Sequence, residues 1–261
     1  MSEAIELNRD GQIAVVTMNR PEKYNALNLE EGEFALKLFT SLSMDDRVRG
    51  VVISGKGKAF CAGADLKWFF SLKQDPSNAI HQFAGQMHQL VLRIRRMKKP
   101  VIAAINGIAA GGGLSLALAC DFRIMSRTAT MLQAYTSAGL SIDGGGTFTL
   151  PRLVGLARAM EIAAFDRPIA SGQALAWGLV TKVVEDEHVL KEAIDMARDL
   201  AEGSLNSFGW VKQLLTDSFN TSFEIQLEHE QEALRHCAAH VDGQEGIRAF
   251  SEKRKPIFNV P

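Results

Sequence analysis

The sequence predicts an α/β protein, and two observations carry that prediction. Up to about Pro151, short runs rich in valine, isoleucine and alanine alternate with helical patterns, which is typical of a sheet packed against helices. Beyond that point strand signals nearly vanish and helical patterns fill most of the chain. The composition, with 46% hydrophobic and 23% charged residues in 261, is that of a globular protein with a full core.

The expected strands follow in chain order. Residues 5–7 and 13–18 flank an Asp10-Gly11 turn and predict a β-hairpin, since Asp-Gly is a favoured hairpin turn. Each later strand is a short apolar run, as buried strands usually are. These runs occupy residues 50–54, 101–105, 122–125 and 179–184.

Helical patterns lie between and after the strands. Over residues 77–97, apolar side chains recur every three or four positions and mark one helical face. Because no linker rich in Pro, Gly or Ser divides the chain, we expect one α/β core over residues 1–200 and a helical C-terminal region over residues 201–261. The later helices are expected at residues 187–201, 205–219, 223–239 and 243–253.

One uncharged stretch, residues 100–120, has the length of a membrane span, which needs about 20 residues. It also contains Asn106-Gly107 and Gly111-Gly112-Gly113, which would interrupt a helix and leave backbone groups unpaired in lipid. We therefore expect a buried strand, a glycine turn and a buried helix here, and no association with a membrane.

Charge and cysteine content exclude several classes of protein. With 29 basic and 30 acidic residues the net charge is -1, which argues against a nucleic-acid partner. Cys61, Cys120 and Cys237 are too widely spaced for a disulfide framework or a zinc site, and no metal is expected. The chain starts with polar residues and shows no apolar signal segment, so we expect a cytoplasmic protein.

Two glycine-containing turns each lead from an expected strand into a helix. The first spans residues 55–65, and the second spans residues 106–113. Such turns present free backbone N–H groups at the start of the helix. Glycines before a helix usually serve only to make the turn, but two turns of this kind can aim two N–H donors at one oxygen.

These turns resemble the two signature segments of the crotonase (enoyl-CoA hydratase/isomerase) superfamily. The first match is Ala-Phe-Cys-Ala-Gly-Ala-Asp-Leu at residues 59–66, and the second runs from residue 99 to the triple glycine. Further matches at residues 19–27, 150–155, 176–180 and 250–258 keep the family order over nearly the whole chain. The resemblance implies a crotonase-like ββα superhelix with a helical C-terminal trimerisation region.

The resemblance also implies an acyl-CoA substrate whose thioester oxygen is held by the backbone N–H groups of Ala64 and Gly112. Coenzyme A then enters as part of the substrate, and no separate cofactor is expected. Family members assemble as trimers, often paired into hexamers. The positions that match the family's CoA contacts are Lys23, Ala26, Ala62 and Leu66, with Lys255 and Phe258 supplied by a neighbouring subunit.

The side chains depart from those of a typical hydratase. The two positions where hydratases carry glutamates are Ser115 and Tyr135, so hydration by the usual pair of carboxylates is disfavoured. Asp143 instead stands where hydratases usually have glycine. An Asp before a glycine run and a helix is equally well read as a helix N-cap. In epoxyphenylacetyl-CoA isomerases and some double-bond isomerases, which this segment resembles, the matching aspartate shuttles a proton.

His88 is the second catalytic candidate. It flanks the apolar face of the helix at residues 77–97, where a lone histidine is more often structural. Together with Asp143 and Tyr135 it also resembles the 4-chlorobenzoyl-CoA dehalogenase, in which the aspartate is the nucleophile, the histidine activates water and an aromatic residue orients the aspartate.

Two enzymatic hypotheses follow. In the first, which we favour because one carboxylate suffices, Asp143 moves a proton and shifts a double bond through a thioester enolate. In the second, Asp143 attacks the substrate and His88 activates water, giving a dehalogenase or an acyl-CoA hydrolase. An enoyl-CoA hydratase ranks third.

A non-catalytic RNA binder ranks last. Its only support is a basic cluster near the end of the helix at residues 77–97, which more simply complements the helix dipole. The cluster consists of Arg93, Arg95, Arg96, Lys98 and Lys99.

Overall fold

The structure, a computed structural model, describes residues 4–72 and 75–258, so the first three residues of the polar chain start lie outside it. Within these residues the larger sheet has six strands, and all neighbours except the hairpin pair are parallel. In sheet order the strands are β1 (Ile5–Asp10), β2 (Ile13–Met18), β3 (Gly50–Gly55), β5 (Val101–Ile105), β7 (Phe122–Ser126) and β10 (Lys182–Val184). Every predicted strand is present. The last is shorter than expected because the Leu179 N–H bonds back to the Ala174 carbonyl.

A second, smaller sheet was not predicted. Its strands have only two or three residues, too few to show a hydrophobic period. β4 pairs in parallel with β6, so the chain leaves both strands at the same edge and the two glycine turns are brought together. In sheet order the strands are β4 (Ala59–Cys61), β6 (Ile108–Ala110), β8 (Thr130–Leu132) and β9 (Ile169–Ala170).

The helices confirm the α/β prediction. The expected helices agree with the structure to within two residues at each end. The one expected at 187–201 begins at Val189 because a 3-10 turn, Asp186–His188, precedes it. The α-helices of the described residues are α1 (Leu29–Met44), α2 (Leu66–Ser71), α3 (Pro76–Arg96), α4 (Gly112–Ala119), α5 (Gly146–Phe165), α6 (Ser171–Ala176), α7 (Val189–Glu202), α8 (Leu205–Asp217), α9 (Phe223–Ala239) and α10 (Val241–Ser251).

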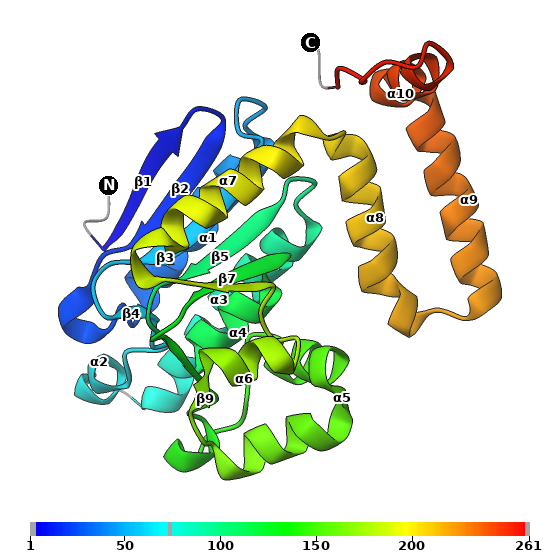
Figure 1. Ribbon diagram of the computed structural model, residues 1–261. Helices are drawn as coiled ribbons and strands as arrows, with labels where there is room; N and C mark the ends of the chain where they lie inside the picture. The colour runs from blue at the N-terminus through cyan, green and yellow to red at the C-terminus, as the bar shows by residue number, and fades with distance from the viewer. Residues whose placement is uncertain (1–3, 73–74, 259–261) are drawn as a thin grey trace.

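Helices cover both faces of the larger sheet. Figure 1 shows α7 crossing one face, with α1 and α3 behind the other. Alternate side chains of β5 point to the two faces of the sheet, as the two-residue period of a strand requires. Ile102 and Ala104 pack with Ala193 and Ala197 of α7, and the remaining residues of β5 belong to the larger core cluster.

The uncharged residues 100–120 form β5, the Asn106-Gly107 turn, β6 and α4, as the expected strand, turn and helix required. All of β5 is buried, and so is α4 from Gly113 to Ala119. Gly113 is obligatory, because a Cβ there would lie 2.0 Å from the Cys61 carbonyl oxygen. Among the described residues, no helix is both long enough and apolar enough to cross a membrane.

We call residues 4–203 the body and residues 205–258 the arm. The arm consists of α8, α9 and α10, which Figure 1 shows projecting from the body, with α8 and α9 antiparallel. One buried ion pair joins them: Lys212 Nζ of α8 lies 2.8 Å from Asp121 Oδ2 of the body. The chain therefore folds into two unequal regions connected through α8.

Candidate active site

A cavity of about 470 Å³ opens where the two glycine turns meet α3 and the loop after β8. We call it the first chamber. Its lining contains six of the residues singled out in the sequence, from three separate segments of the chain. They are Ala62, Ala64, Leu66, Gly112, Tyr135 and Asp143. The remaining lining is mostly apolar, so the first chamber suits an acyl group.

Two free backbone N–H groups line the first chamber. Ala64 is bridged to Leu27, but the bonds of that bridge use the N–H groups of Leu27 and Asp65. The N–H of Ala64 therefore has no acceptor within the described chain. Gly112 is the first residue of α4, whose N–H has no partner inside the helix.

Close packing of the two turns brings these donors together. Gly63 has φ +85°, and a Cβ on it would lie 2.6 Å from the Gly112 nitrogen. Only glycine fits this position, both for its backbone angle and for the space available. Two N–H groups held this close together are able to stabilise a negatively charged oxygen.

Asp143 is the one carboxylate among the described residues that line the first chamber. The hydroxyl of Tyr135 donates a hydrogen bond to its Oδ1. Burial raises the pKa of the Tyr135 phenol well above its ordinary value, and the Asp143 charge raises it further, so the hydroxyl remains a donor at neutral pH. Ser115 Oγ donates to the Asp143 carbonyl at 2.8 Å and fixes its backbone. Asp143 is not a helix cap, because α5 is capped by Gly145.

His88 lies beside Asp143 but outside the lining of the first chamber. Its Nε2 is 3.9 Å from Asp143 Oδ2, and it accepts a hydrogen bond from the Gly144 N–H at 3.4 Å. Half of the side chain is exposed, and it borders an adjoining cavity. The lone pair of Nε2 is thus already used by the loop that carries Asp143.

The sequence matches the family described as enoyl-CoA hydratase/isomerase over residues 8–260. The chain belongs to this family. It is 34% identical over 262 residues to the 1,2-epoxyphenylacetyl-CoA isomerase of Escherichia coli, covering 99% of both chains. It is 38% identical over 256 residues to a probable enoyl-CoA hydratase of Bacillus subtilis, covering 98% of both. An enoyl-CoA hydratase from Polaromonas matches with a TM-score of 0.91 and 34% identity, over 97% of this chain and 98% of that one.

The resemblance seen in the sequence is therefore confirmed, and the chain is an acyl-CoA enzyme of the hydratase/isomerase type. Among the residues expected to contact CoA, Ala62 and Leu66 line the first chamber. Lys23 lies next to them, with its Nζ 3.1 Å from the Asp65 carboxylate that caps α2. Ala26 is buried in the same segment.

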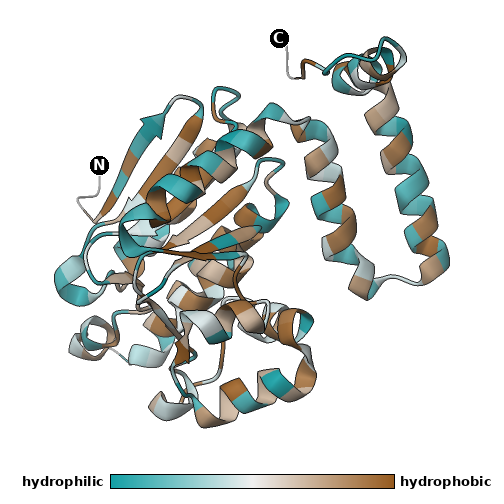
Figure 2. Ribbon diagram, in the orientation of Figure 1, coloured by the Kyte–Doolittle hydropathy of each residue, from teal (hydrophilic) through white to brown (hydrophobic). Residues whose placement is uncertain are grey.

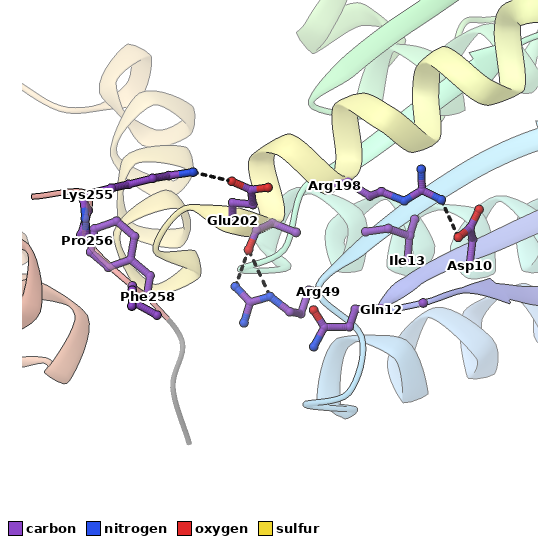
Figure 3. A pocket seen from close by; sticks show the side chains of 12 residues that line it. Asp10, Gln12, Ile13, Arg49, Arg198, Glu202, Lys255, Pro256 and Phe258 are labelled. Carbon is purple, nitrogen blue, oxygen red and sulfur yellow. Dashed lines mark hydrogen bonds and ion pairs between the residues drawn. The ribbon is translucent and has the colours of Figure 1, made fainter.

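The structure places Lys255 and Phe258 elsewhere. Figure 1 shows the C-terminal tail at the opposite side of the molecule from α2. Figure 3 shows both residues at a separate cavity of about 640 Å³, where Lys255 Nζ lies 3.0 Å from a Glu202 carboxylate oxygen. Within one chain these two residues do not meet the first chamber.

The sequence reading missed His81, which lines the first chamber from α3. It lies seven residues before His88, and this spacing of nearly two turns places both on one helical face. That spacing was visible in the sequence. Cys61 also lines the first chamber, but burial raises its pKa to about 11, so its thiol is protonated at neutral pH.

The structure divides the basic cluster at the end of α3. Lys99 is buried, and its ammonium donates to the carbonyls of Leu42 and Asp45 at 2.9 and 2.7 Å. Arg95 lies over the ring of Phe148. Two of the five basic side chains thus contact other parts of the protein, so the cluster offers little free positive charge for binding RNA. No group of three or more metal-ligating side chains occurs in the described residues.

Proposed function

We propose that this enzyme shifts a carbon-carbon double bond in an acyl-CoA, with Asp143 as the acid and base. The observation that carries the proposal is the combination in one chamber of two free N–H groups and a single carboxylate. The N–H groups of Ala64 and Gly112 suit the negative charge that develops on a thioester oxygen. One carboxylate suffices to remove a proton and return it.

The reaction proceeds in two proton transfers. Asp143 takes a proton from the carbon α or γ to the thioester, and the C–H electron pair moves toward the carbonyl to give an enolate. The resulting carboxylic acid then returns the proton to the other carbon, and the double bond is displaced. Because Tyr135 occupies Oδ1, Oδ2 is the oxygen left to carry the proton.

The names of relatives support both an isomerase and a hydratase, so the choice rests on the residues. A hydratase of the usual kind needs two carboxylates, and Ser115 and Tyr135 stand at their positions. The second candidate, nucleophilic attack by Asp143 with His88 activating water, is favoured by their 3.9 Å separation. It ranks lower because His88 Nε2 accepts from Gly144 and is engaged where it would have to take the proton from water.

We further propose that CoA lies against Lys23, Ala26, Ala62 and Leu66, and that the enzyme works as a trimer or a pair of trimers. In such an assembly Lys255 and Phe258 reach the CoA of a neighbouring subunit. The placement of these two residues away from the first chamber of their own chain supports this arrangement.

The test compares the wild type with Asp143→Asn on a panel of enoyl- and aryl-CoAs in D₂O, followed by mass spectrometry. We expect the wild type to move the double bond without adding water, and to gain deuterium to the extent that the protonated, partly exposed Asp143 exchanges with solvent before it returns the proton. Asp143→Asn should lower kcat by about 10²–10⁴-fold, the usual contribution of a general acid-base group.

Three other results would change the assignment. A covalent adduct on Asp143 would favour the nucleophilic mechanism, and a product heavier by one water would favour hydration. Full activity in Asp143→Asn would contradict both roles for the carboxylate. Tyr135→Phe serves as the milder variant, because it keeps the carboxylate and removes only its hydrogen-bond donor.

A further inference from the structure

A second cavity, of about 730 Å³, adjoins the first chamber on the far side of the Asp143 loop. We call it the second chamber. The two cavities share Val91 and Gly144 in their linings, and His88 stands at the edge of the second. The second chamber lies between α3, the start of α5 and α8. Val91 and Gly144 thus stand at the boundary between the two cavities, and a group attached to the reacting carbons would have to pass between them to extend beyond Asp143.

The near part of the second chamber is apolar and its far part is basic. Val91, Leu92 and Phe148 line it, and so does Arg95. Arg95 follows His88 by seven residues on α3, which places it about 10 Å further along the same helical face. An acyl group that enters beside His88 thus passes apolar side chains before it reaches a guanidinium.

Two arginines here form no ion pair with a carboxylate among the described residues. The guanidinium of Arg95 makes no ion pair or hydrogen bond within that part of the chain, although Asp121 and Asp217 lie near enough to attract it, and it lies 5.2 Å from the centre of the Phe148 ring. Arg152 covers the same ring at 3.4 Å and donates to the Phe148 carbonyl, but its Nε is buried without a hydrogen-bond partner. A buried guanidinium donor without an acceptor is unfavourable, so a ligand that supplies one is expected.

The charges around the two arginines leave an excess of positive charge. Arg152 lines a smaller cavity that shares Arg95 with the second chamber. Asp121 in that smaller cavity accepts hydrogen bonds at Oδ2 from Lys212 Nζ and from the Val101 N–H, both at 2.8 Å, so its charge is shared between Lys212 and Arg95. Asp217 is the one acidic residue in the described lining of the second chamber, against Arg95 and Arg96.

We propose that the second chamber binds the far end of the acyl group and that this end is a carboxylate. The substrate class is then an ω-carboxyacyl-CoA, with methylenes against Val91 and Phe148 and the carboxylate at Arg95, where the second chamber meets the smaller cavity that Arg152 lines. The planar fork of a guanidinium matches a carboxylate with two parallel hydrogen bonds. This inference rests on the proposed function and names the substrate of that site.

The test uses two enoyl-CoA thioesters of equal chain length, one ending in a methyl group and one in a carboxylate. We expect the wild type to isomerise the carboxylate-ended thioester with at least about tenfold higher kcat/KM, as one charged hydrogen bond supplies. Arg95→Met and Arg152→Met should each remove about tenfold of that preference, mainly through KM, and leave the methyl-ended substrate nearly unchanged.

Arg93→Met is the matched control, because Arg93 lies on the same helix but lines neither chamber. It should keep the full preference. Arg95→Lys should recover part of it, because the charge remains while the fork is lost. Melting temperatures establish whether each variant is folded. If Arg152→Met does not fold, the preference of Arg95→Met between the two thioesters tests the inference by itself.

If the wild type isomerises both thioesters with equal kcat/KM, the inference is overturned and the proposed function stands. An equal loss on both substrates in Arg95→Met would also overturn the inference and leave the proposed function standing. If neither thioester is isomerised, the proposed function fails. The inference is then tested by the dissociation constants of the two thioesters, and tighter binding of the carboxylate-ended one would support it. Binding of free glutarate that needs Arg95, without any preference between the thioesters, would assign the site to a free carboxylate and overturn the substrate class.

Discussion

The body buries most of its large apolar side chains, whereas the arm leaves most of its own exposed. Every residue of β5 is buried, whereas Ala233 is the one buried residue among the seventeen of α9. Figure 2 shows brown, hydrophobic segments along α8 and α9 beyond the body. Large apolar residues of the arm that are exposed are Val211, Leu215, Phe219, Phe223, Ile225, Leu227, Leu234, Val241, Ile247, Phe250 and Ile257.

The difference suggests separate roles for the two regions in the proposed function. The body buries its own core and holds the whole first chamber, so the chemistry depends on one chain's body. The arm exposes more apolar surface than a solvated helix pair needs, which is typical of a surface that contacts another protein. This fits the trimer proposed above, in which the arm contributes to binding rather than to proton transfer.

The largest effect should follow from removing a backbone donor in the body. Gly112→Pro deletes one N–H of the proposed oxyanion hole, at the first helical position, where the helix itself tolerates proline, although the ring carbon on the nitrogen must fit beside Gly63. We expect kcat to fall by about 10²–10³-fold. Gly112→Ala is the control: it keeps the N–H, and its Cβ would lie 3.5 Å from the Gly63 Cα, an ordinary contact. Equal activity of the two variants would show that this N–H is not used.

The junction of the two regions should respond next. Lys212→Met leaves the Asp121 carboxylate buried without its ammonium partner, which costs roughly 3–5 kcal/mol of unfolding free energy. Urea denaturation at one fixed protein concentration measures the loss. The double variant Asp121→Asn/Lys212→Met should recover most of it, because no buried charge remains unpaired. A single variant as stable as the wild type would mean that this ion pair does not hold α8 in place.

The smallest effect is expected in the arm. Lys255 is exposed, and its ion pair with Glu202 is of the kind that contributes about 0–1 kcal/mol, so Lys255→Gln should leave folding intact. If the arm reaches CoA in a neighbouring subunit, KM for the acyl-CoA should rise several-fold while kcat is unchanged. Lys253→Gln, two residues earlier in the same tail, is the matched control. An unaltered KM would show that Lys255 does not contact CoA.

Much of the fold was predictable because its periods are long enough to recognise. The hairpin of β1 and β2, the strands β3, β5 and β7, and the long helices α3 and α9 all followed from apolar spacing. The smaller sheet did not, because β4, β6 and β8 have three residues each and are defined by their pairing. Pairing across distant segments depends on tertiary packing, which no local pattern records.

The candidate site divides in the same way. The sequence singled out Ala64, Gly112, Tyr135 and Asp143, and the structure brings all four to the first chamber. The sequence also predicts that the C-terminal tail, with Lys255, contacts CoA in a neighbouring subunit. This requires a second copy of the chain and stays a prediction. The second chamber was out of reach, because the partners of Arg95 can be judged only once α5 and α8 are placed beside α3.

The close packing of Gly63 against Gly112 has a consequence for how such an enzyme can change. In the proposed mechanism the groups that stabilise charge belong to the main chain, so ordinary side-chain replacements leave the two N–H donors in place. The groups proposed to select the reaction, at positions 115, 135 and 143, are side chains that a single codon change can exchange. New reactions can therefore arise by point mutation around an oxyanion hole that is inherited unaltered.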